Sequence, residues 1–159
     1  MAMCKLQTIH DAREQIINNI RNSKQTPENF IPKSDEINLD EWELECDDNG
    51  KIIGQGNLYS NKGDWYSCTI QKLYIHPDFR GKGIGRNIVG RLINKAKNKK
   101  DNGFDDCQIL TADVDRNNEA SRNLFEKMGF KIRETFCVPE DNKKADVLRM
   151  TLAGIKKCG

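Results

Sequence analysis

The chain has 159 residues, of which 31% are charged and 36% are hydrophobic, a balance typical of a single soluble globular domain. No apolar run approaches the roughly 20 residues that a membrane span requires, and the N-terminal segment becomes polar too early for a secretory signal. A net charge of only +2 creates no field that would demand a nucleic acid partner. These properties predict a cytoplasmic protein that binds neither membranes nor nucleic acids.

A basic run is the local exception to this even charge distribution. Lysines in the last turn of a helix complement its dipole, so the run is interpreted as a solvated helix end and a nucleic acid patch is the disfavoured alternative. The run consists of Lys95, Lys97, Lys99 and Lys100.

Six cysteines are spread along the chain without a C-x-x-C pair, and only His10 and His76 could complete a metal site. This spacing gives neither a zinc signature nor a disulfide framework. Reduced, buried thiols and no bound metal are therefore expected. The cysteines lie at positions 4, 46, 68, 107, 137 and 158.

The N-terminal third is predicted to be a strand, a helix and a long irregular segment. The strand covers Lys5–Ile9, and Asp11 is the expected N-cap of the helix. The helix carries isoleucines 16, 17 and 20 on one face. Periodicity is then lost over Ser23–Leu39, where two prolines interrupt the pattern, so a loop or broken helix is expected.

The rest of the chain alternates between strand and helix patterns. A hairpin turn at Asp47-Asp48-Asn49-Gly50 and a glycine-rich turn after Ile75 separate the first of these elements. In order, the pattern predicts strands at Trp42–Cys46, Lys51–Tyr59 and Trp65–Ile75, an amphipathic helix after the glycine-rich turn, a strand at Cys107–Val114, a helix at Glu119–Met128 ended by Gly129, and strands at Lys131–Val138 and Asp146–Leu152. This order predicts one mixed α/β (α+β) domain over residues 1–159, with its core at about 5–152.

The turn after the third strand is the most informative segment. Three glycines alternate through Arg80-Gly81-Lys82-Gly83-Ile84-Gly85 and open directly into the amphipathic helix. Glycines let backbone amides approach a ligand without interference from Cβ atoms, and a helix N-terminus adds unpaired donors and a positive dipole end. Arg80 and Lys82 add mobile positive charge beside them. The segment is therefore a predicted anion cradle.

Two common nucleotide motifs do not fit this cradle. A dinucleotide fingerprint requires a glycine where Arg86 stands. A P-loop requires Lys and Ser or Thr after its second glycine, but Arg91 and Leu92 follow Gly90. A tight turn without a ligand would explain one of the three glycines but not their alternation.

The glycine turn, preceded by Leu73-Tyr74-Ile75, resembles the pyrophosphate loop, R/Q-x-x-G-x-G/A, of the GNAT superfamily of N-acetyltransferases. The segment from Asn118 to Phe130 resembles the second signature of that family, an Asn-led helix that ends in E-K-x-G-F. The order and separation of the two motifs are also similar, over nearly the whole chain. The resemblance implies a mostly antiparallel sheet with a central parallel strand pair that splays apart, and acetyl-CoA as cosubstrate.

The resemblance also implies roles for individual residues. The backbone of Leu73 and Ile75 would pair with the pantetheine arm, and the turn would hold the pyrophosphate. Asn118 would reach the arm, a role that is compatible with capping the last helix. The complete cofactor-binding set expected from the resemblance is Leu73, Tyr74, Ile75, Arg80, Gly81, Lys82, Gly83, Ile84, Gly85, Arg86, Asn118, Ser121 and Phe125.

Asp113 is the candidate general base. It lies five residues before Asn118, where alanine acetyltransferases of ribosomal proteins in this family carry Glu, and on a strand it should point away from the core. Because Asp is shorter than Glu, the resemblance favours proton transfer through a bridging water. A purely structural carboxylate is the alternative, and the loop residue His76 is a disfavoured candidate base.

The chain departs from the family pattern in two respects. Many relatives carry Tyr as the acid at the place of Phe125, and others carry a base where this chain has Thr69 or Gln71. Either the thiolate leaves unaided or another hydroxyl, Tyr74, donates the proton, and Phe125 packs against the CoA arm. These departures keep open an alternative function as a catalytically weak acetyl-CoA-binding regulatory module.

The acceptor is expected to be a primary amine, either a small molecule or a peptide N-terminus. It would bind on the face formed by the first helix, the Ser23–Leu39 segment and the last hairpin around Val138–Ala145. An acidic cluster in the long segment after the first helix would suit a cationic amine. Exposed charges of this kind also occur where they serve solubility alone. The cluster consists of Glu28, Asp35, Glu36, Asp40 and Glu41. Both a monomer and a homodimer are compatible with the sequence.

Overall fold

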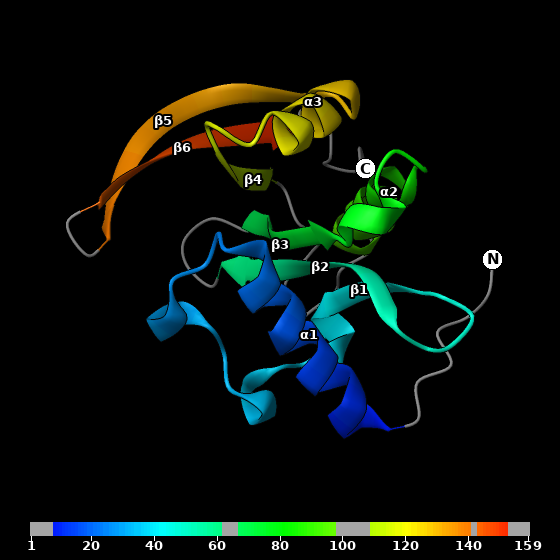
Figure 1. Ribbon diagram of the computed structural model, residues 1–159. Coiled ribbons are helices and arrows are strands. Elements are labelled where there is room, and N and C mark those ends of the chain that lie inside the picture. The colour runs from blue at the N-terminus through cyan, green and yellow to red at the C-terminus, as the bar shows by residue number, and fades with distance from the viewer. Residues whose placement is uncertain (1–7, 62–66, 98–108, 141–142, 153–159) are drawn as a thin grey trace, which may run out of the picture. The chain divides into compact units, whose positions relative to one another are not determined.

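The computed structural model describes residues 8–61, 67–97, 109–140 and 143–152, with side chains for 8–60, 68–97 and 109–132 (Figure 1). Short 3₁₀ turns join several of the elements. Within these residues the helices are α1 (Ile9–Ser23), α2 (Ile84–Lys97) and α3 (Glu119–Lys127), and the strands are β1 (Trp42–Cys46), β2 (Ile52–Asn61), β3 (Ser67–Ile75), β4 (Ile109–Asp115), β5 (Phe130–Glu140) and β6 (Lys143–Leu152).

The strands form a sheet in the order β1-β2-β3-β4-β6-β5. The pairs β1–β2, β4–β6 and β5–β6 are antiparallel, whereas β3 and β4 run parallel. The predicted mixed α/β architecture, mostly antiparallel with one parallel pair, is confirmed. The chain divides into two compact units, the first made of residues 1–57 and 72–89 and the second of 58–71 and 90–159. The single domain over residues 1–159 stays a prediction.

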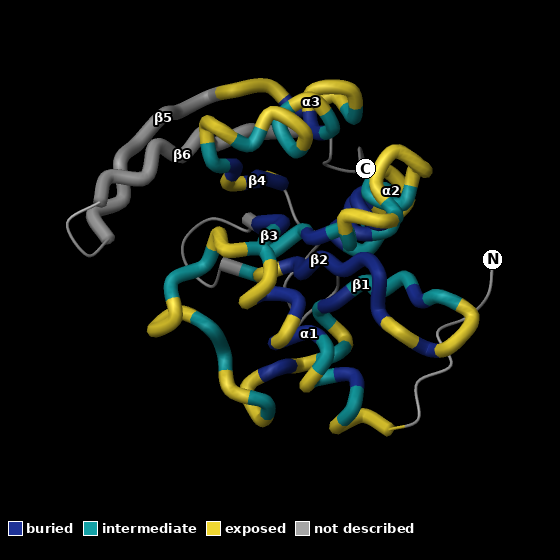
Figure 2. The backbone as a smooth tube through the Cα atoms, in the orientation of Figure 1, coloured by how far each residue is buried: buried dark blue, intermediate teal, exposed yellow. Residues whose placement is uncertain are grey.

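In the first unit, α1 packs on the β1–β2 hairpin. Figure 2 shows buried and exposed positions alternating along α1. A buried polar pair also joins the helix to the hairpin. The Asn19 Nδ2 atom donates to Gln55 Oε1 at 3.0 Å, and Gln55 Nε2 donates to the Ile16 carbonyl at 3.1 Å. The apolar core consists of Ala12, Ile16, Ile17, Ile20, Ile37, Trp42, Cys46 and Ile52.

Helix α1 begins earlier than the sequence pattern predicts. Thr8 is the N-cap, because its Oγ1 accepts a hydrogen bond from the Asp11 amide at 2.9 Å. The Asp11 carboxylate instead accepts from Gln15 Nε2 at 3.0 Å. The predicted Asp11 cap is therefore wrong, and so is the strand at Ile9, a 62% exposed residue of the first helical turn. Residues 5–7 of that predicted strand lie outside the described residues.

The segment after α1 is irregular, as predicted, and contains 3₁₀ turns at Glu28–Phe30, Ser34–Glu36 and Leu39–Glu41. The β1–β2 hairpin follows. Its turn is fixed by Asp47, whose Oδ1 atom accepts from the amides of Asn49 and Lys51, each at 2.9 Å. Gly50 adopts φ 82°, a left-handed conformation that glycine tolerates best. The predicted hairpin is confirmed.

The second unit contains the parallel pair and α3. The β3–β4 ladder runs from Ser67↔Ile109 to Ile70↔Ala112. In the middle of it, the hydroxyls of Thr69 and Thr111 lie 3.0 Å apart in the buried interior. Helix α3 is followed by Gly129 at φ 96°, the predicted helix stop.

The described cysteines differ from one another. Cys68 is a buried free thiol, whereas Cys46, at the end of β1, is disulfide-bonded. The expectation of reduced thiols is thus confirmed for Cys68 and wrong for Cys46. C-x-x-C spacing marks local redox and metal motifs, so it carries no information about a bond between cysteines that are distant in sequence. Among the described residues, no group of three or more metal-ligating side chains occurs and no helix is long and apolar enough to cross a membrane.

Candidate functional site

The glycine turn of the first unit connects β3 to α2 through a 3₁₀ turn at Pro77–Phe79. Gly81 and Gly83 have φ values of 78° and 81°, and both are exposed. An ideal Cβ atom at either glycine would have no protein atom within 4 Å. The two glycines therefore adopt a conformation that L side chains disfavour, in a place where the protein itself leaves open space.

The backbone amides of this turn are available to a ligand. The first amides of α2 have no acceptor within the helix, which begins at Ile84. Among the residues described, no carbonyl accepts a hydrogen bond from the amides of Gly81, Lys82 or Gly83. The exposed cations Lys82 and Arg86 flank these donors. Donors, dipole and charge together fit an anionic ligand.

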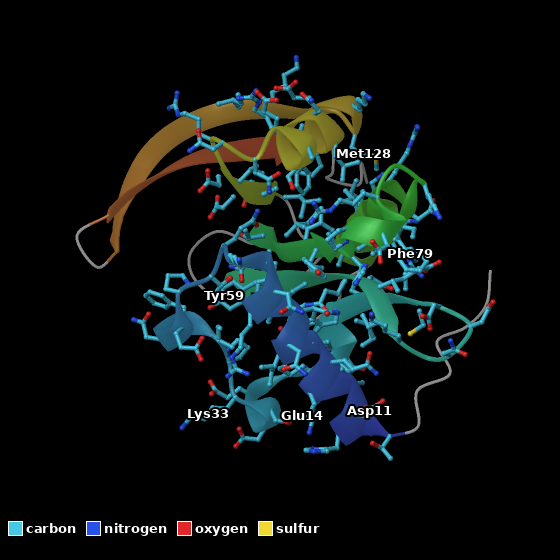
Figure 3. The ribbon with its side chains drawn as sticks, in the orientation of Figure 1. Asp11, Glu14, Lys33, Tyr59, Phe79 and Met128 are labelled. Atoms are coloured by element: carbon cyan, nitrogen blue, oxygen red, sulfur yellow. The ribbon has the colours of Figure 1, made fainter. Side chains whose placement is uncertain are left out.

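The ring of Phe79 contacts side chains on both sides of it in the sequence. The Phe79 ring meets the His76 ring edge to face at a centroid distance of 5.9 Å, and the Lys82 Nζ atom lies 5.3 Å from the Phe79 centroid. Phe79 lies near the start of α2 (Figure 3). The His76 Nδ1 atom accepts from the Asp78 amide at 3.2 Å, so this histidine acts as the cap of the 3₁₀ turn.

Arg80 is more constrained than the glycine-turn motif predicts. Its Nε atom donates to the Ile75 carbonyl at 3.1 Å, so the guanidinium group is tied to the end of β3. The expectation of mobile charge is wrong for Arg80. Since a carbonyl oxygen has two lone pairs, Ile75 can still accept a second hydrogen bond.

Gly54 positions the glycine turn, a role that the sequence analysis misses. A Cβ atom at Gly54 would lie 2.8 Å from side-chain atoms of Ile84 and Ile88 and 3.2 Å from Ile75. Without a side chain there, the start of α2 packs directly on β2. The His76 amide also donates to the Ile53 carbonyl at 2.7 Å. A glycine inside a strand is the sequence signal that indicates such a close approach.

Tyr74, the candidate acid, precedes this turn on β3. It is only 7% exposed, between the half-buried Leu73 and Ile75. The strand thus presents the expected alternation of burial up to the glycine turn. A proton-donating role for its hydroxyl stays a prediction.

The second unit carries the remaining candidate residues. Asp113 is exposed between the buried residues Ala112 and Val114, and it lies opposite Arg149 in the β4–β6 register. Its side chain therefore points away from the core, as strand alternation predicts. A role of this carboxylate as a base stays a prediction.

Asn118 and Phe125 have clear structural roles in α3. The Asn118 Oδ1 atom accepts from the Ser121 amide at 3.1 Å and so caps the helix. Phe125 is 3% exposed and meets Phe130 edge to face at a centroid distance of 5.1 Å. The observed role of Phe125 is thus packing against the ring of Phe130.

The candidate residues fall into two groups, one in each unit. The first unit contains residues 73–75 and 80–86, and the second contains Asp113, Asn118, Ser121 and Phe125. Thr69, where some relatives carry a base, is held by the hydroxyl of Thr111.

Comparison with known proteins places this arrangement in a family. The chain is 33% identical over 97 residues to the L-amino acid N-acyltransferase MnaT of Escherichia coli, an alignment that covers 56% of this chain and 49% of the relative. It is 31% identical over 97 residues to an L-methionine sulfoximine/L-methionine sulfone acetyltransferase of Salmonella typhimurium, covering 56% of this chain and 50% of the relative. The alignments thus span about half the length of these curated relatives.

Solved structures share the fold at low sequence identity. The yncA protein of Salmonella typhimurium, solved with acetyl-CoA, matches with a TM-score of 0.67 at 19% identity and covers 94% of this chain and 93% of its own. A chain of the NatC complex, solved with Gag peptide and CoA, matches with a TM-score of 0.72 at 18% identity, covering 88% of this chain and 89% of its own. The model of the acetyltransferase (GNAT) family matches residues 13–130. The chain therefore belongs to the acetyltransferase (GNAT) family.

Proposed function

We propose that this protein is an acetyl-CoA-dependent N-acetyltransferase that acetylates the primary amine of a small, amino-acid-like acceptor by direct attack in a ternary complex. The observation that carries the proposal is the glycine turn, whose exposed amides, left-handed glycines and helix N-terminus suit a pyrophosphate. Family membership and the acetyl-CoA or CoA bound to its structural neighbours support the choice of cosubstrate.

The chemistry requires a neutral amine against the thioester carbonyl. The α-amine of an amino acid has a pKa above about 7 and arrives mostly protonated, so a base must remove a proton before or during the attack. Asp113 is the proposed base, acting directly or through water. Backbone amides near the thioester would stabilise the oxyanion that forms during the attack. Tyr74 is the proposed proton donor to the departing thiolate, because Phe125 has no hydroxyl group.

The names of two relatives support the proposed acceptor class. Two of them act on free amino acids or their analogues, according to their names, and the chain shares about a third of its aligned residues with each. The NatC structure contains a bound peptide, and the N-terminus of a peptide presents an α-amine without the adjacent carboxylate of a free amino acid. A free α-amino acid is therefore the proposed acceptor.

An acceptor panel with labelled acetyl-CoA tests the proposal. The panel contains free amino acids, peptides with free N-termini, polyamines and aminoglycosides, and CoA release is measured in parallel. We expect acceptor-dependent thiol release with amino acids. Tight acetyl-CoA binding without acceptor-dependent release would instead identify the regulatory module.

The Lys82→Ala variant should weaken CoA binding about two- to fivefold, the range that an exposed ion pair supplies. Pantetheine, which lacks the phosphates, should bind the variant and the native protein equally. Calorimetry with both ligands at two salt concentrations measures the effect, which should shrink at high salt. Lys97→Ala, at the other end of α2, is the matched control. Equal losses for CoA and pantetheine would show that Lys82 acts on the turn and not on phosphate.

A further inference from the structure

Lys72 has a left-handed backbone conformation inside a strand. Among the described residues, two that are not glycine have a positive φ, namely Lys72 at 54° and Lys24 at 55°. Lys24 follows the last turn of α1 and donates its amide to the Arg21 carbonyl at 3.1 Å, an ordinary helix C-cap. Lys72 lies within β3, where this explanation does not apply. A residue with a Cβ atom is disfavoured in this conformation.

The position of Lys72 links this strain to the proposed chemistry. The β3–β4 ladder ends at Ile70↔Ala112, two residues before Lys72. The next residues, Leu73–Ile75, form the stretch that the proposed function assigns to the thioester arm. Strained backbone conformations persist where the surroundings hold them in place, and they concentrate at ligand-binding sites. The left-handed residue of β3 thus lies between the end of this ladder and the proposed site.

The electrostatic setting of Lys72 favours an anionic ligand. The residue is partly buried, and this burial lowers the pKa of its ammonium group from the usual 10.5. A charge in such a place is less screened by water than a surface charge. A carboxylate that binds there therefore gains more electrostatic binding energy than it would at an exposed lysine. Its negative charge would also raise the pKa of the ammonium group again.

We propose that the Lys72 ammonium group holds the carboxylate of an α-amino-acid acceptor. This inference rests on the proposed function and names the residue that selects its substrate class. In an α-amino acid the carboxylate and the amine share one carbon, so holding the first also places the second.

The test compares two acceptors that differ in one charge. L-methionine sulfone carries the carboxylate. In its carboxamide derivative a neutral amide replaces the carboxylate, while the amine and the side chain are the same. Lys72→Met should raise the KM of the acid about ten- to a hundredfold, the loss expected for a hydrogen bond to a charged group, with kcat within about twofold. The KM of the carboxamide should stay unchanged. Lys72→Arg should restore much of the affinity for the acid.

Two further variants separate ligand binding from backbone strain. Lys24→Met removes the other left-handed lysine and should leave both acceptors unaffected. Lys72→Gly relieves the strain, so it should raise the melting temperature while it raises the KM of the acid as Lys72→Met does. A lysine with a purely structural role would not combine these two effects.

Several results would overturn the inference. Equal KM losses for the acid and its carboxamide would exclude a carboxylate contact. A fall in kcat at unchanged KM, with one limb of the pH profile lost, would make Lys72 a proton carrier instead. If the native protein binds acetyl-CoA but acetylates no amine, the proposed function fails. Calorimetric binding of L-methionine sulfone to the native protein and to Lys72→Met then still decides the role of Lys72.

Discussion

Gly83→Val is expected to remove most acetyl-CoA binding from a protein that remains folded. Gly83 has a φ of 81°, where a β-branched residue is a strong outlier, yet the space around its missing Cβ contains no protein atom within 4 Å. The side chain would therefore occupy the space proposed for the pyrophosphate, and the strained backbone would turn its amides away. Calorimetry should show an affinity loss of about a hundredfold for Val and about tenfold for Ala, equivalent to one or two charged hydrogen bonds.

Gly129→Ala is the matched control for this experiment. Gly129 follows α3 with a φ of 96°, and it is exposed like Gly83. The substitution introduces similar backbone strain outside the proposed cradle, so it should lower the melting temperature and leave acetyl-CoA affinity unchanged. Circular dichroism checks that all variants are folded. Full affinity in a folded Gly83→Val protein would show that the glycine turn does not hold the cosubstrate.

Strands and helices could be predicted wherever the hydrophobic residues recur with the period of a single strand or helix. Alternation along β4 correctly places Ala112 and Val114 inside and Asp113 outside, because successive strand side chains point to opposite faces. The start of α1 could not be fixed in this way. Thr8 and Asp11 are both good capping residues, and the choice between them depends on whether Ile9 belongs to the helix or to a strand.

The sequence predicts the glycine turn of the candidate site, but not the conformation of Lys72 or the disulfide at Cys46. The alternating glycines indicate an anion cradle from sequence alone, and Gly81 and Gly83 have the left-handed conformation that makes glycine necessary there. Lys72 gives no such signal, because lysine has no preference for a positive φ and only the folded strand imposes it. The disulfide at Cys46 could not be predicted from the sequence either, since it depends on a tertiary contact.

Two features of the fold limit where a proton acceptor can lie. Thr69, at a position that carries a base in some relatives, has its hydroxyl 3.0 Å from that of Thr111 in a buried pair. A threonine hydroxyl also has no titratable form near neutral pH, so it cannot serve as a base. Asp113, by contrast, is exposed and carries a carboxylate, which can accept a proton directly or through a water molecule.

Asp113→Asn is accordingly expected to lower kcat about 10²- to 10⁴-fold, the usual contribution of a general base. Asn has nearly the same shape and cannot accept the proton, so acetyl-CoA affinity should be retained. The loss should shrink as the pH rises toward the pKa of the acceptor amine, because a growing fraction of the amine then arrives neutral. A pH profile of kcat for both proteins with one verified acceptor measures this convergence.

Asp115→Asn is the control on the same strand. The Asp115 Oδ1 atom accepts from the Asn117 amide at 2.8 Å, and an asparagine oxygen can accept the same hydrogen bond. That variant should therefore stay active, because a carboxylate with a structural role loses little when it becomes an amide. If Asp113→Asn behaves like Asp115→Asn across the whole pH range, Asp113 is structural too. The amine proton would then leave to solvent or to the acceptor itself, and the rate would depend on pH only through the ionisation of the acceptor.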